Sequence, residues 1–157
     1  MSQSKWIETD TVHDHISTLE GVIPKDAWGE TSYFYNPGRI FERGTYFATV
    51  KQKDGDNDKA SHLDRDGIWR LNIGVTKGTY FERFGPPPPR PGKGGIVDGD
   101  WNYTALDTLT PHPVYGWMSW VAVLNPSKTT WQQCIALIED AHGRAKINFE
   151  KRVEKLP

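Results

Sequence analysis

Apolar and polar residues alternate most clearly from Gly67 to Val75, which reads GIWRLNIGV. A period of two residues is typical of a β-strand that turns one face to the core. The apolar set is Trp69, Leu71, Ile73 and Val75, and we expect it to face the core. The opposite set contains Arg70 and Asn72, so the second face of this strand is polar enough to meet water or a ligand.

The longest apolar run lies between His112 and Ser127 and reads HPVYGWMSWVAVLNPS. No charged residue interrupts Met118–Leu124, and both of its alternating faces are largely apolar. Such a segment predicts a strand that is covered on both sides. The Asn-Pro-Ser sequence that follows favours a turn, because proline presets one backbone angle.

The rest of the chain divides into further helices and strands. Helical spacing of apolar residues predicts a helix over Thr11–Val22 and a short helical piece over Tyr103–Leu109. Two more helices are expected to begin at N-cap residues: one of about two turns after Thr76, and a long terminal one after Ser127 or Asn125. Aromatic and hydroxyl-bearing residues predict strands over Trp28–Tyr35 and Tyr46–Lys51. The last helix carries the stripe Trp131, Cys134, Ile135, Ile138, His142, Ala145 and Phe149. The predicted core cluster is Trp69, Leu71, Ile73, Val121, Val123, Ile135 and Ile138.

Together these elements predict an α+β fold. We expect a mainly antiparallel sheet of about four to five strands, with an N-terminal helix and a long C-terminal helix packed on it, because the gaps between the early strands are too short for helical crossovers. Residues 1–157 form a single expected domain with a core from about 11 to 150. Pro86–Gly95 has no periodicity and should be an exposed, mobile loop within that domain.

Composition and charge narrow the class of protein. The 157 residues are 36% apolar and 25% charged, which is typical of a globular chain, and the net charge of −1 gives no general attraction to nucleic acid or to an anionic membrane. No apolar run approaches the roughly 18 residues that span a bilayer. Met1–Asp10 is polar and lacks a signal-peptide centre. The expectation is therefore a cytoplasmic protein without a membrane partner.

We expect neither a metal nor a cofactor. Asp54, Asp56 and Asp58 begin like a calcium loop, but lysine stands at position 59, where the sharp turn needs glycine, and arginine at position 65, where a glutamate should close the shell. These residues are better explained as a solvated loop between strands. His13 and His15 lie two apart on a predicted helix, so their side chains diverge. Cys134, the single cysteine, excludes an internal disulfide and belongs to the apolar stripe.

The candidate ligand site combines the polar face of the alternating strand with the start of the apolar run. Its residues are Arg70, Asn72, His112, Tyr115 and Trp117. An arginine and an amide on a rigid strand, flanked by aromatic rings, suit an anionic or planar small ligand. In the alternative interpretation, Arg70 pairs with a nearby acid such as Asp64 or Asp66 and only covers the sheet.

Three stretches carry a resemblance to a known family. LDRDGIWRLNIGV (Leu63–Val75), HPVYGWMSWVAVLNPS (His112–Ser127) and EDAHGRA (Glu139–Ala145) resemble the motifs LDRxGVFRLNIGVS, HPVYGxMxWVxVLNPS and AHxRA. These motifs are typical of small bacterial proteins that form a family of unknown function. The resemblance covers about Val12 to Ala145. Asp66 replaces the usual proline, and Lys77-Gly78 replaces a pair that favours helix more strongly; both changes fall in loops or helix starts.

A more distant similarity, in element order, is to the MmcQ/YjbR-like proteins. It implies an antiparallel sheet with packed helices, and a DNA-binding role has been suggested for that fold. Three functions are therefore open. The first is a non-enzymatic domain that binds a small ligand. The second is an enzyme with His112 as general base, oriented by Asp107. The third is a nucleic-acid-binding domain of the MmcQ/YjbR type, which the near-neutral charge disfavours. Oligomeric state does not follow from the sequence.

Overall fold

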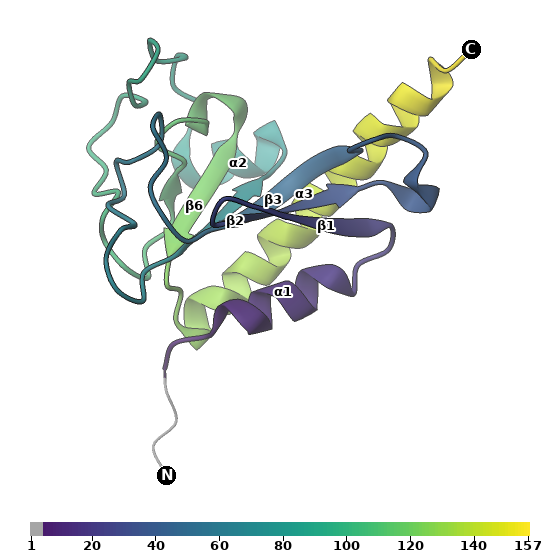
Figure 1. Ribbon diagram of the computed structural model, residues 1–157. Coiled ribbons are helices and arrows are strands. Elements are labelled where there is room, and N and C mark those ends of the chain that lie inside the picture. Colours follow the sequence, from purple (N-terminus) through teal and green to yellow (C-terminus); the bar gives the residue numbers. More distant parts are fainter. Residues whose placement is uncertain (1–4) are drawn as a thin grey trace.

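A six-stranded antiparallel sheet in the order β1-β2-β3-β4-β6-β5 organises the computed structural model, which describes residues 5–157 (Figure 1). The strands are β1 (Val22–Ala27), β2 (Glu30–Tyr35), β3 (Thr45–Lys51), β4 (Arg70–Gly74), β5 (Thr110–Pro111) and β6 (Trp120–Leu124). The helices are α1 (Thr9–Ser17), α2 (Lys77–Phe84) and α3 (Lys128–Glu154), with short 3-10 turns η1 (Pro37–Arg39) and η2 (Gly116–Met118). The α+β prediction is confirmed, with one or two more strands than expected.

The core lies between the sheet and two helices on one of its faces. The long helix α3 packs across β2, β3 and β4, while α1 packs beside β1 on the same side of the sheet (Figure 1). Leu71 and Ile73 of β4 point into this layer and are fully buried there, together with Ile138 of α3. In the described part of the chain, no helix combines the length and the apolar character needed to cross a membrane.

The predicted core cluster is confirmed except at one position. Six of its members, Trp69, Leu71, Ile73, Val121, Val123 and Ile138, are buried. Ile135 of α3 is only partly buried and packs at the margin of the core. The predicted N-caps at Thr76 and Ser127 are also confirmed. The side-chain hydroxyl of each accepts a hydrogen bond from the backbone N–H three residues later.

The first half of the chain contains a strand that the sequence did not predict. The predicted helix over Thr11–Val22 ends earlier, and Val22 begins β1, which pairs with β2. Pro24 therefore lies in an edge strand, where a residue without a backbone N–H is tolerated. Trp28 and Gly29 have φ angles of 55° and 79° and form the turn of the β1–β2 hairpin. The predicted strand started at Trp28 because Trp-Gly is not one of the common turn pairs.

The predicted strand from Met118 is also shorter than expected. Gly116–Met118 forms η2, Ser119 adopts a φ of 69°, and only Trp120–Leu124 forms β6. A Cβ on Gly116 would lie 3.1 Å from the Cβ of Pro111, so this turn packs closely against β5. The rest of the prediction is confirmed, because every residue of β6 is buried. Tyr103–Leu109, predicted as a short helix, contains turns and no helix, so that prediction is wrong.

Two long segments, 52–69 and 85–109, lie together beside β6 (Figure 1). Arg65 in the first donates a hydrogen bond of 3.2 Å to the carbonyl of Thr104 in the second. Pro86–Gly95 is largely exposed, as predicted, and the chain is anchored again at Val97, which is 2% exposed. These segments leave a hollow on the sheet face opposite α3.

Candidate functional site

A pocket of about 280 Å³ lies on the sheet face that carries Asn72. It is lined by Glu30, Ser32, Tyr46, Thr49, Lys51, Gly55, Asn57, Asp58, Asn72, His112, Tyr115 and Trp120. Ligand sites in proteins commonly begin at roughly 300 Å³, so this pocket has room for a small ring system. Three of the five residues predicted for the site line it, namely Asn72, His112 and Tyr115.

The floor of the pocket is a row of polar side chains on three adjacent strands. Ser32 of β2 pairs in register with Thr49 of β3, and Thr49 pairs with Asn72 of β4. Directly opposed residues on neighbouring strands point to the same face, so the three side chains form a line across the sheet. Nδ2 of Asn72 donates a hydrogen bond of 2.8 Å to Oγ1 of Thr49.

A β-bulge places an aromatic side chain at one end of this floor. Tyr33 pairs with Ala48 and Phe34 with Tyr46, so Phe47 is an extra residue in β3. The bulge lets Tyr46 and Thr49 line one pocket although they are three residues apart. The Tyr46 ring lies against Trp120 of β6, with 5.1 Å between ring centroids.

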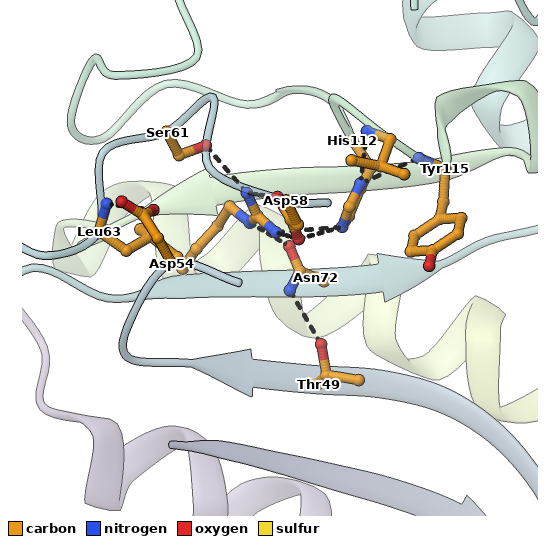
Figure 2. A network of polar contacts seen from close by, with 10 residues as sticks. Thr49, Asp54, Asp58, Ser61, Leu63, Asn72, His112 and Tyr115 are labelled. Atoms are coloured by element: carbon orange, nitrogen blue, oxygen red, sulfur yellow. Dashed lines mark hydrogen bonds and ion pairs between the residues drawn. The ribbon is translucent and has the colours of Figure 1, made fainter. Parts of the chain in front are cut away.

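Arg70 lies beneath the pocket and does not line it. Its side chain is fully buried, and its guanidinium is held by Asp58, Ser61 and Asn72, which Figure 2 labels. Nε donates to Oδ1 of Asn72 at 2.7 Å, and Nη1 donates to Oγ of Ser61 at 2.9 Å. Nη1 also donates to Oδ1 of Asp58 at 3.0 Å, while Nη2 pairs with the second oxygen of the same carboxylate. The partner acid is therefore Asp58, and not Asp64 or Asp66.

The acidic loop folds over the sheet to deliver Asp58. Oδ1 of Asp54 accepts a hydrogen bond of 2.8 Å from the N–H of Leu63, and the N–H of Asp54 donates to Asp64 at 3.0 Å, which ties the two ends of the loop together (Figure 2). The expectation of a solvated loop is wrong for Asp58, whose side chain is only 16% exposed. Burial by itself raises the pKa of a carboxyl, but the hydrogen bonds and the charge of Arg70 outweigh it and lower the pKa of Asp58.

His112 is held in one protonation state by its neighbours. Its Nδ1 accepts hydrogen bonds from the backbone N–H groups of Val114 and Tyr115, both at 3.0 Å. Because a backbone N–H only donates, Nδ1 carries no proton and the neutral ring is protonated at Nε2. Nε2 lies 3.8 Å from Oδ2 of Asp58 and 3.2 Å from Nη2 of Arg70. With the proton on Nδ1, the ring N–H would face the two backbone N–H donors of Val114 and Tyr115. With the proton on Nε2, the ring has only one donor–donor contact, which is with Nη2 of Arg70.

Burial makes the His112 ring neutral. It lowers the pKa of His112 well below its ordinary value, and the adjacent Arg70 charge lowers it further, although Asp58 acts in the opposite direction. In this state neither ring nitrogen has a free lone pair, and the Nε2–H lies on the side of Asp58 and Arg70. A base at this position would need to release Nδ1 from two backbone N–H groups or lose the Nε2 proton.

The pocket therefore presents a mixed polar lining opposite an aromatic side. Lys51 supplies donors, Glu30 and Asp58 supply carboxylate oxygens, and Tyr46, Tyr115 and Trp120 supply ring surfaces. The charges in and beneath the pocket sum to zero, because the positive Lys51 and Arg70 are matched in number by the negative Glu30 and Asp58. Within residues 5–157, no three His, Cys, Asp or Glu side chains converge to hold a metal ion.

The structure separates the remaining predicted residues from this pocket. Trp117 lines a second hollow next to it, beneath Arg90. Asp107, which the enzyme hypothesis places behind His112, instead accepts a hydrogen bond of 2.7 Å from the backbone N–H of Ser127 at the start of α3.

Sequence reasoning missed Asp58, Ser61 and Thr49. Thr49 itself was a usable signal, because it is the one polar residue within the run Tyr46–Val50 of β3. For Asp58 the only signal was the need of Arg70 for a carboxylate. Several acidic residues stand nearby in the sequence, and the sequence does not show which of them pairs with Arg70.

Comparisons with known proteins give a family and no activity. No curated protein and no solved structure matches the chain. The distant likeness to the MmcQ/YjbR-like proteins therefore stays a prediction. One family model matches residues 7–154, which is nearly the whole chain and includes every residue of the pocket. The chain thus belongs to the family of unknown function DUF6194.

Proposed function

We propose that this protein is a binding domain for a small planar ligand, which occupies the pocket on the sheet face between Asn72, His112 and Tyr115. One observation carries the proposal: the pocket lies over a buried, hydrogen-bonded network that fixes the orientation of its polar groups before any ligand arrives. Preorganised polar groups beside an apolar surface are the usual composition of a small-molecule site.

The aromatic side of the pocket supports a planar ligand. Tyr46 is 42% exposed and Tyr115 is 43% exposed, although both are large rings on a face that the loops otherwise cover. A planar group placed between them buries ring surface on both sides, and its edge then faces the polar floor. Stacked aromatic pairs gain roughly 0.5–1.5 kcal/mol beyond area burial.

Binding is favoured over the enzyme hypothesis by the state of His112. Its Nδ1 is occupied by two backbone N–H groups, and Nε2 carries the proton. The residue is therefore poorly suited to remove a proton from a ligand. A nucleic-acid role gains no comparable support, because the hollow is a small pocket on a charge-balanced surface.

The proposal is tested by thermal-shift screening of small planar compounds, with nucleosides included, against matched variants. Tyr115→Ala removes a ring from the lining of the pocket, and Trp28→Ala removes an 86% exposed ring that does not line it. We expect at least one compound to raise the melting temperature of the wild type and of Trp28→Ala, and not that of Tyr115→Ala. No shift with any compound, or an equal shift in both variants, would show that the pocket is not a binding site.

A further inference from the structure

A second pocket of about 370 Å³ adjoins the first. Its lining comes mainly from the Pro/Gly loop and from the turn after β5: Asn57, Arg90, Pro91, Gly92, Lys93, Gly94, Gly95, Val114, Tyr115 and Trp117. Asn57 and Tyr115 line both pockets, so the two hollows share a boundary. A single ligand that occupied both hollows would therefore cross this boundary beside Asn57 and Tyr115.

The charge of the second pocket differs from that of the first. Arg90 and Lys93 contribute two positive charges, and among the described residues no acid lines it. Neither cation is ion-paired within residues 5–157. Beneath the sheet pocket, by contrast, the guanidinium of Arg70 has four of its five N–H groups bonded to Asp58, Asn72 and Ser61, so it has no free fork for an anion.

The guanidinium of Arg90 stacks on Trp117. Its guanidinium carbon lies 4.8 Å from the centroid of the Trp117 ring. Contact with the ring occupies one face of the guanidinium and leaves its N–H edge available for oxygen atoms. This contact also gives a role to Trp117, the predicted site residue that lies outside the sheet pocket.

The backbone of the loop is also open to a ligand. Gly92, Gly94 and Gly95 surround Lys93, and Gly94 has a φ of 76° in a turn closed by the bond from the N–H of Gly95 to the carbonyl of Gly92 at 2.9 Å. Glycines let a ligand approach the main chain closely, as in loops that hold phosphate groups. Two cations and an accessible backbone match an oxyanion with several oxygens better than a single carboxylate.

We infer that the Arg90–Lys93 pocket binds the phosphate group of a ligand whose planar part occupies the sheet pocket, so that the ligand class is a phosphorylated planar compound such as a nucleoside monophosphate. The inference rests on the proposed function for the planar part, whereas the phosphate subsite stands on the second pocket alone. It also separates the two ligand properties expected from the sequence, placing the planar group over the sheet and the anionic group at the loop.

The subsite is tested first with inorganic phosphate. In ¹⁵N-labelled protein, phosphate at constant ionic strength should shift the amide signals of Gly92, Lys93, Gly94 and Gly95 saturably. The shifts should vanish in Arg90→Gln/Lys93→Gln and persist in Lys151→Gln/Lys155→Gln, which removes the same charge from the exposed end of α3. No saturable shift, or equal shifts in both double variants, overturns the subsite whatever happens in the sheet pocket.

The link between the two pockets is tested with matched pairs that share one base: adenosine with AMP and uridine with UMP, measured by calorimetry. The phosphorylated member should bind about ten- to a hundred-fold more tightly to the wild type, as expected for charge-assisted contacts. In Arg90→Gln/Lys93→Gln the advantage should fall to about two-fold or less, with the affinity for the nucleoside unchanged.

The outcomes separate the two claims. Nucleosides that bind without any gain from phosphate would leave the proposed function standing and overturn the inference. Phosphate binding at the loop with no affinity for either nucleoside or nucleotide would remove the single-ligand inference, and the compound screen would then decide the proposed function alone. Protection of the Lys93–Gly94 bond from trypsin by AMP, and not by adenosine, gives a second readout that supports the inference.

Discussion

Arg70→Met should strongly destabilise the protein, although the sequence places Arg70 on the polar face of its strand. The guanidinium is fully buried and bonded to Asp58, Asn72 and Ser61. Methionine keeps most of the apolar stem and leaves the Asp58 carboxylate without its partner. Removing one member of a buried ion pair costs about 3–5 kcal/mol, whereas an exposed pair is worth under about 1 kcal/mol. For a domain of this size the loss lowers the melting temperature by roughly 6–20 °C.

Urea unfolding of a double-mutant series and one control variant measures this cost and its origin. The series is wild type, Arg70→Met, Asp58→Asn and the double variant, with Arg43→Met as the control for an exposed arginine. Because both single changes leave a buried group unpaired, the double variant should be more stable than the sum of the two losses, by about 0.5–3 kcal/mol. Arg43→Met should stay within about 0.5 kcal/mol of wild type. If Arg70→Met unfolds within about 1 kcal/mol of wild type, or if the losses add, the network does not stabilise the fold as argued.

Three other predictions use the same unfolding and digestion assays. Burial lowers the pKa of His112 in the folded protein. Below about pH 6.5 the unfolded chain therefore binds a proton at His112 that the folded protein does not bind, and the free energy of unfolding should fall by about 1.4 kcal/mol per pH unit. Unfolding curves between about pH 7 and about pH 5 should show this slope in wild type and a shallower one in His112→Gln; equal slopes would mean that the folded ring is protonated too. Ile73→Ala should cost roughly 2–5 kcal/mol, because the side chain is fully buried against α3, and an unchanged urea midpoint would place Ile73 outside the core. Trypsin should nick the free protein first near Lys93, which is exposed in a loop without regular structure, and resistance at that bond would show that the loop is packed.

The central strand shows how much of the fold follows from local pattern. Strict alternation fixed which side of β4 faces the core, and the burial of Leu71 and Ile73 confirms it. The same pattern could not say what lies over the other face. Whether Arg70 meets water, a ligand or an acid depends on how the preceding loop folds back over the sheet, and five aspartates between positions 54 and 66 compete for that role in the sequence.

The boundaries of the pocket show why the remainder could not be predicted. The bulge at Phe47 moves Tyr46 to the face of Thr49, and a bulge leaves no periodic signal because it is a single break in the period. The turn that delays the start of β6 until Trp120 depends on close packing of Gly116 against Pro111, and such a contact is not a propensity of the local sequence. The residues that shape the pocket were visible in the sequence, and their juxtaposition was set by tertiary packing.

The buried ion pair gives the pocket a fixed pattern of donors. Because Nε of Arg70 donates to Oδ1 of Asn72, the amide of Asn72 must turn its Nδ2 toward Thr49 and the pocket floor. Because two backbone N–H groups occupy Nδ1 of His112, the ring must turn its Nε2–H toward Asp58. Neither side chain can reverse its donor and acceptor without breaking a buried hydrogen bond, which costs about 1–3 kcal/mol. A ligand that enters the pocket therefore meets an Asn72 amide and a His112 ring whose donor and acceptor positions are already fixed by the protein.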